Sequence, residues 1–197
     1  MQGSMTITPV TALVTALTLG LASPSAHADP ATTSIATTPV TEVDFQAKVL
    51  APHAGRVVLV SVWATYCLPC LEELPGMLKL RKKLAKLGAD IVFVNVDGTD
   101  GPPAHLAAAL QRRSIALDHT FVVTVADPAP FLAVVDKSWS GEVPYHAVYG
   151  RDGKRLVGLA GARPLAELEQ AVVAALATAP EHAATSPAAA PAAPRPP

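Results

Sequence analysis

Two short runs that are apolar at all but one position each dominate the middle of the chain. Residues 57–63 and 91–96 consist mostly of β-branched and other apolar side chains. A strand with one face in water alternates apolar and polar positions, whereas a continuous apolar strand is typical of a sheet covered on both faces. The pattern therefore predicts two buried, parallel central strands with helices packed on both sides of the sheet.

The segment between these runs changes to a helical spacing. Over residues 68–87 apolar side chains recur every three or four positions, and Gly88 supplies a carboxyl-terminal stop. Pro75 lies within this stretch, and we expect it to bend the helix without ending it, because the apolar pattern resumes beyond it. A strand, a helix and a strand of these lengths predict a right-handed crossover.

The second half of the chain adds further helices and strands. We expect, in chain order, helix 104–113, strand 121–125, helix 130–139, strands 145–149 and 155–160, and a last helix after Pro164. The Asp152-Gly153 pair between the last two strands indicates a hairpin. The predicted fold class is α/β: a sandwich of helices on a mixed sheet that is parallel at its centre and carries an antiparallel edge hairpin.

The two ends differ from this patterned middle. Residues 1–28 carry no Lys or Arg but contain an apolar segment of about 13 residues, too short for a bilayer span and suited to a secretory signal peptide. Small residues at Ala26 and Ala28 predict cleavage before Asp29. Residues 29–41 are expected to form a flexible linker and residues 178–197, mostly Ala and Pro, a disordered tail. Residues 42–177 remain as one folded domain.

The charge of the chain argues against one class of partner. There are 15 Lys and Arg against 16 Asp and Glu. The one dense basic stretch, residues 79–86, falls late in the predicted helix, where positive charge complements the helix carboxyl end. We therefore expect no nucleic-acid partner.

The candidate chemistry lies at the start of the helix that follows the first central strand. Cys67 and Cys70 are the only cysteines in the sequence. A disulfide across so short a loop would stabilise the fold by only about 2 kcal/mol, so a redox-active pair explains it better than a structural bridge. The helix amino terminus favours negative charge on Cys67, while Cys70 lies one turn further in. We expect Cys67 to be the nucleophile and Cys70 the resolving thiol.

Around this pair the chain resembles a known family. Residues 60–75 read VSVWATYCLPCLEELP, which is similar to the active-site segment of the thioredoxin superfamily, in its exported, TlpA-like branch of thiol-disulfide oxidoreductases. That branch typically carries Trp-Ala-Thr before the dithiol and Glu-x-Pro after it. A helix and strand inserted at residues 104–125 and the Val143-Pro144 pair before the edge hairpin extend the resemblance. It implies a thioredoxin-like three-layer sandwich.

The resemblance also implies roles for individual residues. Pro144 would be the cis-proline that faces the dithiol, and with Val143 it would present a backbone edge to a substrate polypeptide. Glu73 would be the buried carboxylate that accepts the proton of the resolving thiol. Cytoplasmic thioredoxins usually keep a buried aspartate at the position of Ser61, which leaves Glu73 as the candidate here. Trp63 is expected to wall the dithiol and to contact substrate.

The expected function is that of an exported protein thiol-disulfide reductase, located in the periplasm or another extracytoplasmic compartment. Its partners would be client proteins with disulfides or thiols and a membrane electron donor, and cytochrome c maturation is the task typical of the branch. We expect a monomer with no metal and no cofactor beyond the Cys67–Cys70 disulfide. Three alternatives stay open: a disulfide oxidase or isomerase, an interaction protein with a vestigial dithiol, and a zinc or copper module that uses the same pair.

Overall fold

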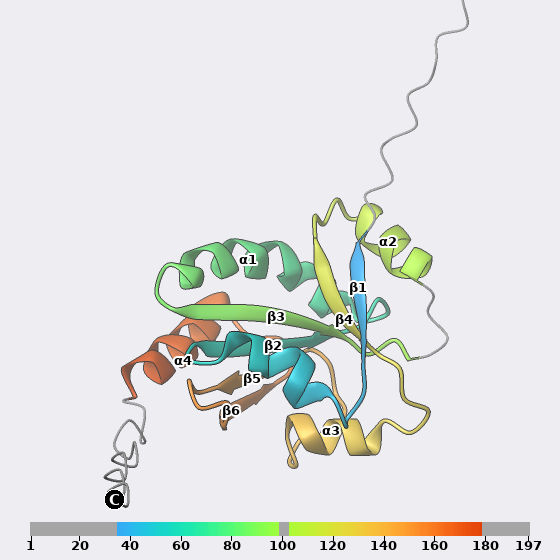
Figure 1. The fold of residues 1–197 in the computed structure, drawn as a ribbon. Coiled ribbons are helices and arrows are strands. Elements are labelled where there is room, and N and C mark those ends of the chain that lie inside the picture. Colours follow the sequence, from blue (N-terminus) through green and yellow to red (C-terminus); the bar gives the residue numbers. More distant parts are fainter. Residues whose placement is uncertain (1–34, 99–102, 179–197) are drawn as a thin grey trace, which may run out of the picture. The chain divides into compact units, whose positions relative to one another are not determined.

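A six-stranded sheet forms the centre of the computed structural model, which describes residues 35–98 and 103–178 (Figure 1). The strands are β1 (Ala36–Val40), β2 (Val57–Trp63), β3 (Ala89–Asn95), β4 (His119–Val123), β5 (Tyr145–Tyr149) and β6 (Arg155–Ala160). The helices are α1 (Leu68–Ala85), α2 (Pro103–Gln111), α3 (Ala129–Val135) and α4 (Leu165–Ala177), with short helical turns η1 (Gln46–Leu50) and η2 (Ala51–His53).

The strand order is β1-β4-β3-β2-β5-β6. The pairs β1·β4, β4·β3 and β3·β2 are parallel, whereas β5 is antiparallel to both β2 and β6. The helix α2 and strand β4 are the insertion expected before the edge hairpin. The predicted mixed sheet, with a parallel centre and an antiparallel edge hairpin, is therefore confirmed.

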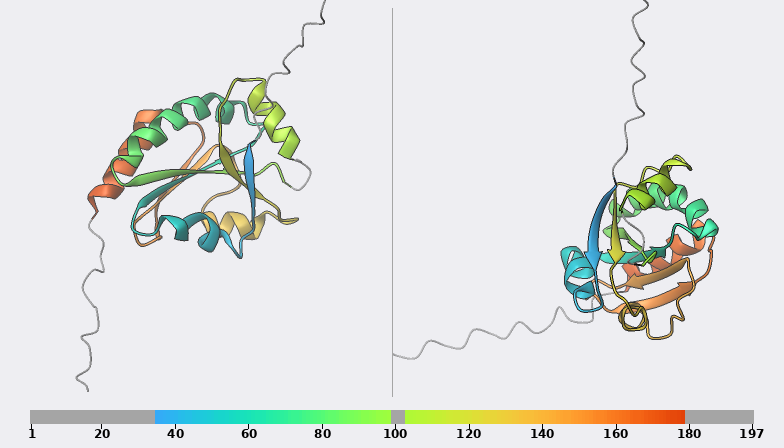
Figure 2. Two further views of the ribbon diagram at one scale, coloured as in Figure 1. Left: turned by 45° about the horizontal axis from the view of Figure 1, so that its top comes forward. Right: turned by 90° about the vertical axis from the view of Figure 1, so that its right-hand side faces the viewer.

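The sheet is covered on both faces, as the apolar strands require. Successive side chains of a strand point to opposite faces, so Leu59 and Trp63 join a cluster with α1, α2 and α4, whereas Val58, Val60 and Val62 pack with η1 and α3. Figure 2 shows α1 and α4 together on one side of the sheet and α3 with the η turns on the other. Every residue of β2 is buried, which explains why all of them except Ser61 are apolar.

The expected elements are present, and the largest differences in their boundaries concern one strand and one helix. The predicted strand 121–125 is β4, two residues earlier in the chain, and the predicted helix 130–139 ends at Val135 because Asp136 is extended (φ −160°, ψ 121°). The larger correction concerns the linker 29–41, whose residues 36–40 form β1. These residues alternate poorly, but their backbone pairs with β4 from Ala36↔His119 to Val40↔Val123, and Pro39 is tolerated because β1 is an edge strand.

Other predictions made for the chain ends fall outside this description. The predicted signal peptide (residues 1–28), the first part of the linker and all but the first residue of the predicted tail lie outside the described residues. Of the helices in residues 35–98 and 103–178, none is both long enough and apolar enough to cross a membrane.

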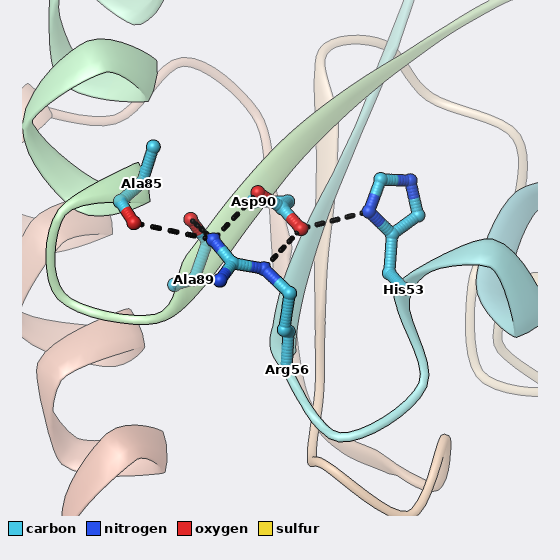
Figure 3. A network of polar contacts seen from close by, with 5 residues as sticks. All are labelled: His53, Arg56, Ala85, Ala89 and Asp90. Carbon is cyan, nitrogen blue, oxygen red and sulfur yellow. Dashed lines mark hydrogen bonds and ion pairs between the residues drawn. The ribbon is translucent and has the colours of Figure 1, made fainter.

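A polar network ties the amino-terminal ends of β2 and β3 together (Figure 3). Asp90 accepts hydrogen bonds from Arg56 Nε and Nη2 at 2.6 and 2.9 Å, and His53 Nδ1 lies 2.8 Å from Asp90 Oδ2. Arg56 also donates to the carbonyls of Ala85 and Ala89. Partial burial acts to raise the pKa of Asp90, but the bonds from Arg56 and His53 outweigh it and hold that pKa below its usual value.

This network predicts a pH-dependent contribution to stability. Because the folded-state pKa of Asp90 is lowered, its stabilisation is present above the unfolded value of about 3.9 and is lost as the pH falls through the folded-state pKa. Replacing Asp90→Asn should lower the free energy of unfolding by about 1–3 kcal/mol at neutral pH. Urea denaturation of both proteins at neutral and strongly acidic pH would show the difference shrinking in acid.

Asp152→Asn is the matched control for this measurement. Asp152 lies in the hairpin turn with an exposed side chain that pairs only with Lys154, so its replacement should change the free energy of unfolding by no more than about 0.5 kcal/mol. Equal losses at both positions, or a loss at Asp90 that does not vary with pH, would contradict the role given to the network.

Candidate active site

The two cysteines lie at the junction of β2 and α1. They form a disulfide with a Cα–Cα distance of 5.3 Å. Cys67 is the N-cap of α1, and its Sγ accepts the Cys70 backbone N–H at 3.2 Å. Pro69 occupies the first turn, where its missing N–H leaves no helical bond unmade. The sulfur of Cys67 thus occupies the position that Ser or Asp side chains take at a helix start, where backbone donors favour negative charge.

The two cysteines are both buried and differ slightly in exposure, in the direction expected. Cys67 is 6% exposed and Cys70 2% exposed. The residues beside Cys67 are far more open: Tyr66 is 72% and Leu68 49% exposed. Cys67 is therefore flanked on both sides by exposed apolar side chains.

Glu73 lies one turn after Cys70 and points into the protein. Its side chain is only 14% exposed, whereas Glu72 is exposed. The Oε1 atom accepts the backbone N–H of Arg163 at 2.8 Å, and the Oε2 atom lies 3.3 Å from Nε2 of His146. A carboxylate held in this way on the dithiol helix can exchange a proton with a nearby group.

The Val143-Pro144 bond is cis. The register Val62↔Tyr145, continued by one position, places Pro144 opposite Trp63, at the end of β2 where the dithiol segment begins. Val143 is partly buried and packs against the cluster that contains both cysteines. Pro144 O accepts the Gly161 N–H at 2.9 Å, while no backbone hydrogen bond to another described residue is found for Val143. The backbone edge at Val143 is therefore free beside the dithiol.

A cluster of four side chains on the other face of the sheet holds this segment. We call it the brace, and its members are Asp136, Trp139, Tyr145 and Arg155. Trp139 stacks on Tyr145 with ring centroids 4.7 Å apart, and its Nε1 donates to the carbonyl of Glu142 at 2.8 Å. The Tyr145 hydroxyl donates to Asp136, whose Oδ2 also lies 2.9 Å from Arg155 Nη1. Both residues that flank Val143-Pro144 are thus fixed to the core.

The contacts between Asp136 and Tyr145 shift the pKa values of both residues. Burial acts to raise the pKa of Asp136, but hydrogen bonds from Tyr145 and Ser138 outweigh it, so that this pKa is lowered. Burial and the bond to Asp136 raise the pKa of Tyr145 far above its usual value. Asp136 is therefore a carboxylate at neutral pH and Tyr145 a neutral donor to it.

The structure corrects one predicted site residue. Trp63 is 1% exposed, packs in the core beneath α1, and donates through Nε1 to Thr120 Oγ1 at 3.1 Å. It supports the dithiol segment from within and does not line a substrate surface. Cys67 and Cys70 begin α1 just after β2, at the end of β2 where the strand register also places Pro144, and Glu73 lies one turn after Cys70 on the same helix.

His146 is a residue of this region for which the sequence suggested no role. It is fully buried on β5, within a strand whose five residues are all buried. The available signal was an ionisable residue in the middle of an apolar strand, which burial makes costly unless a partner is present.

The described residues do not add metal ligands to the Cys67–Cys70 pair. Among residues 35–98 and 103–178, no group of three or more His, Cys, Asp or Glu side chains is placed to hold a metal ion.

Comparison with known proteins agrees with the fold and the dithiol segment. The Redoxin family matches residues 26–139. Thiol-disulfide oxidoreductase ResA of Oceanobacillus iheyensis is 39% identical over 59 residues, which is 30% of this chain and 31% of that protein. A protein of the same name from Bacillus cereus is 24% identical over 130 residues, 66% of this chain and 69% of that protein.

A solved structure shows the same fold. The thiol:disulfide interchange protein, thioredoxin family protein from Chlorobium tepidum TLS has a TM-score of 0.50 at 23% identity, over 64% of this chain and 83% of that chain. The match to the Oceanobacillus protein spans less than a third of that relative's length.

The brace predicts that Gly158 cannot carry a side chain. A Cβ at Gly158 on β6 would overlap the Tyr145 hydroxyl and the Asp136 carboxylate. Gly158→Ala should therefore lower the free energy of unfolding by about 1–3 kcal/mol, the usual cost of overpacking, as measured by urea denaturation.

Gly150→Ala is the control, because its Cβ would approach only the Asp152 carboxylate, at 3.1 Å, and Leu156, at 3.5 Å. Both neighbours have side chains that can move, so this variant should lose much less stability. A Gly158→Ala protein as stable as the wild type would show that the close approach to the brace is not required.

Proposed function

This chain belongs to the Redoxin family, in the TlpA-like branch of the thioredoxin superfamily, and on that basis we propose that it is a thiol-disulfide oxidoreductase that acts on other proteins. The observation that carries the proposal is the Cys67–Cys70 disulfide at the amino terminus of α1, beside the Val143-Pro144 segment. Two relatives of the chain are named thiol-disulfide oxidoreductase.

In the proposed reaction, the reduced Cys67–Cys70 pair reduces a disulfide of a client protein in two steps. A Cys67 thiolate attacks a client disulfide, forming a Cys67–client S–S bond and releasing the other client sulfur as a thiolate. Cys70 then attacks the Cys67 sulfur, the Cys67–Cys70 bond forms, and the second client sulfur leaves. The client gains two electrons, and the dithiol is oxidised to the disulfide seen here.

The remaining site residues support these two steps. The free backbone edge of Val143 next to Pro144 would pair with the extended client segment around its disulfide. Tyr66 and Leu68 add exposed apolar surface beside Cys67. Glu73 would take the proton of the Cys70 thiol when Cys70 attacks, because a thiolate is the nucleophile in disulfide exchange.

We propose further that the protein works as a reductase outside the cytoplasm. The support is the resemblance of residues 60–75 to the exported branch and the signal-like pattern of residues 1–28. A membrane electron donor would restore the dithiol after each cycle, and cytochrome c maturation is the task that the resemblance suggests. The protein would act as a monomer, without a metal or an added cofactor.

Trapping of client proteins tests the activity directly. In Cys70→Ser the first exchange can occur but the second cannot, so mixed disulfides through Cys67 should accumulate when the variant is expressed with its own leader. They would be counted by nonreducing electrophoresis and identified by mass spectrometry after purification of the variant.

Cys67→Ser is the matched control, since it keeps one thiol on the same helix but removes the proposed nucleophile. It should trap far fewer partners. The proposed exchange would be rejected if both variants trapped partners equally. It would also be rejected, in favour of a vestigial dithiol, if neither variant trapped partners and the wild type did not reduce insulin.

The direction of electron flow has its own measurement. Known dithiol proteins range from about −270 mV for thioredoxin to about −120 mV for the oxidant DsbA. A reductase should lie toward the lower end when the Cys67–Cys70 couple is equilibrated with glutathione or dithiothreitol buffers and the thiols are counted. A value near the upper end would instead indicate the oxidase alternative.

A further inference from the structure

His146 is a buried ionisable residue to which the proposed reaction gives no task. It is 0% exposed, and neither ring nitrogen has a hydrogen-bond partner of good geometry among the described residues. The charged atom beside it is Glu73 Oε2, 3.3 Å from Nε2. An imidazole without other partners in the core is expected to interact chiefly with that carboxylate.

The sheet register brings this imidazole to the dithiol side of the sheet. His146 pairs with Ser61 on β2, and side chains of such a pair share one face. That face is the one that packs against α1 and α4, because Leu59 and Val148, two positions from Ser61 and His146, belong to the cluster with those helices. His146 therefore lies under the dithiol helix, where it contacts Glu73, which follows Cys70 by one helical turn.

The surroundings of His146 offer it one charged partner. Ser61 faces it from β2, Leu159 pairs with it from β6, and α4 presents Leu168 and Val172 to the same cluster. The guanidinium of Arg163 is turned away, toward the Ala160 carbonyl and Glu167, and only its backbone N–H reaches Glu73. Among these neighbours, Glu73 is the charged group in contact with the ring.

We propose that His146 is a positioning residue of the dithiol: it holds Glu73 and takes up the proton that Glu73 receives from Cys70. This inference rests on the proposed function. As Cys70 attacks the mixed disulfide, its S–H proton passes to Glu73, the Cys67–Cys70 bond forms, and the Cys67–client bond breaks with its electron pair on the client sulfur. The proton ends on the imidazole, and the return step reverses each transfer.

The chemistry of the two groups explains why both are needed. In solution a carboxylic acid has a pKa of about 4.3, an imidazole about 6.5 and a thiol about 8.5. Transfer of a proton from a thiol to a lone carboxylate is therefore far uphill, whereas an imidazole as the final acceptor removes about half of that difference. The Arg163 N–H on Oε1 favours the ionised carboxylate and leaves Oε2 for the exchange.

The pH dependence of disulfide closure tests the proposal. Reduced protein is mixed with excess oxidised glutathione, so that closure of the Cys67–glutathione mixed disulfide by Cys70 limits the rate. In His146→Gln the amide can still donate to Glu73 but cannot take a proton. Closure should slow about tenfold at about pH 6 and be nearly unchanged at about pH 9, where thiols ionise unaided.

His53→Gln is the matched control, because His53 also contacts a carboxylate, that of Asp90, at the opposite ends of the strands. It should keep the wild-type profile. A His146→Gln protein slowed by the same factor at both pH values would have lost only packing, and one with the wild-type profile would have lost nothing; either result overturns the proposal.

Two further measurements keep the outcome unambiguous. If His146→Gln does not fold, NMR of the wild type and of Glu73→Gln replaces this experiment. In the wild type, one buried histidine resonance should titrate differently in the oxidised and the reduced protein. In Glu73→Gln this difference should vanish. If the wild-type resonance does not titrate differently, the proposal is wrong. If the wild-type protein never forms a Cys67–glutathione disulfide, the proposed function itself is rejected. If the wild-type protein exchanges normally and the pH profile of His146→Gln equals that of the wild type, only the role of His146 is rejected.

Discussion

The antiparallel pairing of β5 with β2 is the contact on which the whole site depends. The four parallel strands β1, β4, β3 and β2 build the part of the sheet in which β2 ends just before the dithiol. The register Val62↔Tyr145 brings the Val143-Pro144 edge to that end, and the register Ser61↔His146 brings a histidine under α1. One strand pairing thus fixes both the surface that would meet a client and the polar group beneath the helix.

That pairing carries an energetic cost because β5 is buried on both faces. A fully buried strand is normally apolar, yet β5 contains Tyr145, His146 and Tyr149. The tyrosines face α3, where Tyr145 donates to Asp136 and Tyr149 donates to the Val135 carbonyl at 2.8 Å. His146 faces the other way, toward Glu73. Each face of the strand therefore needs its own polar partner, and those partners lie next to the candidate site.

Much of this arrangement could be predicted from the sequence because it depends on local patterns. Apolar runs fixed the place of β2 and β3, helical spacing gave α1, and the Asp-Gly turn gave the hairpin. The strand β1 was missed because its stability comes from backbone pairing with β4, some 80 residues away, and not from its own side chains. Trp63 was assigned to a substrate surface because a sequence shows that an aromatic residue is near the cysteines but not which face of the strand it occupies.

The same limit explains why Glu73 was a candidate from the sequence and His146 was not. Glu73 shares a helix with Cys70, so its spacing is visible, whereas the contact with His146 joins residues 73 apart in the chain. Cys67 has backbone donors and no acidic residue in the first helical turn, which favours its thiolate without help from any side chain. Among the residues that the structure describes, no such donor to the Cys70 sulfur is found, and Cys70 is slightly more buried than Cys67. In the reaction we propose, the acceptor of its proton, Glu73, lies on the same helix, and the strand pairing of β5 with β2 supplies the imidazole that takes the proton from Glu73.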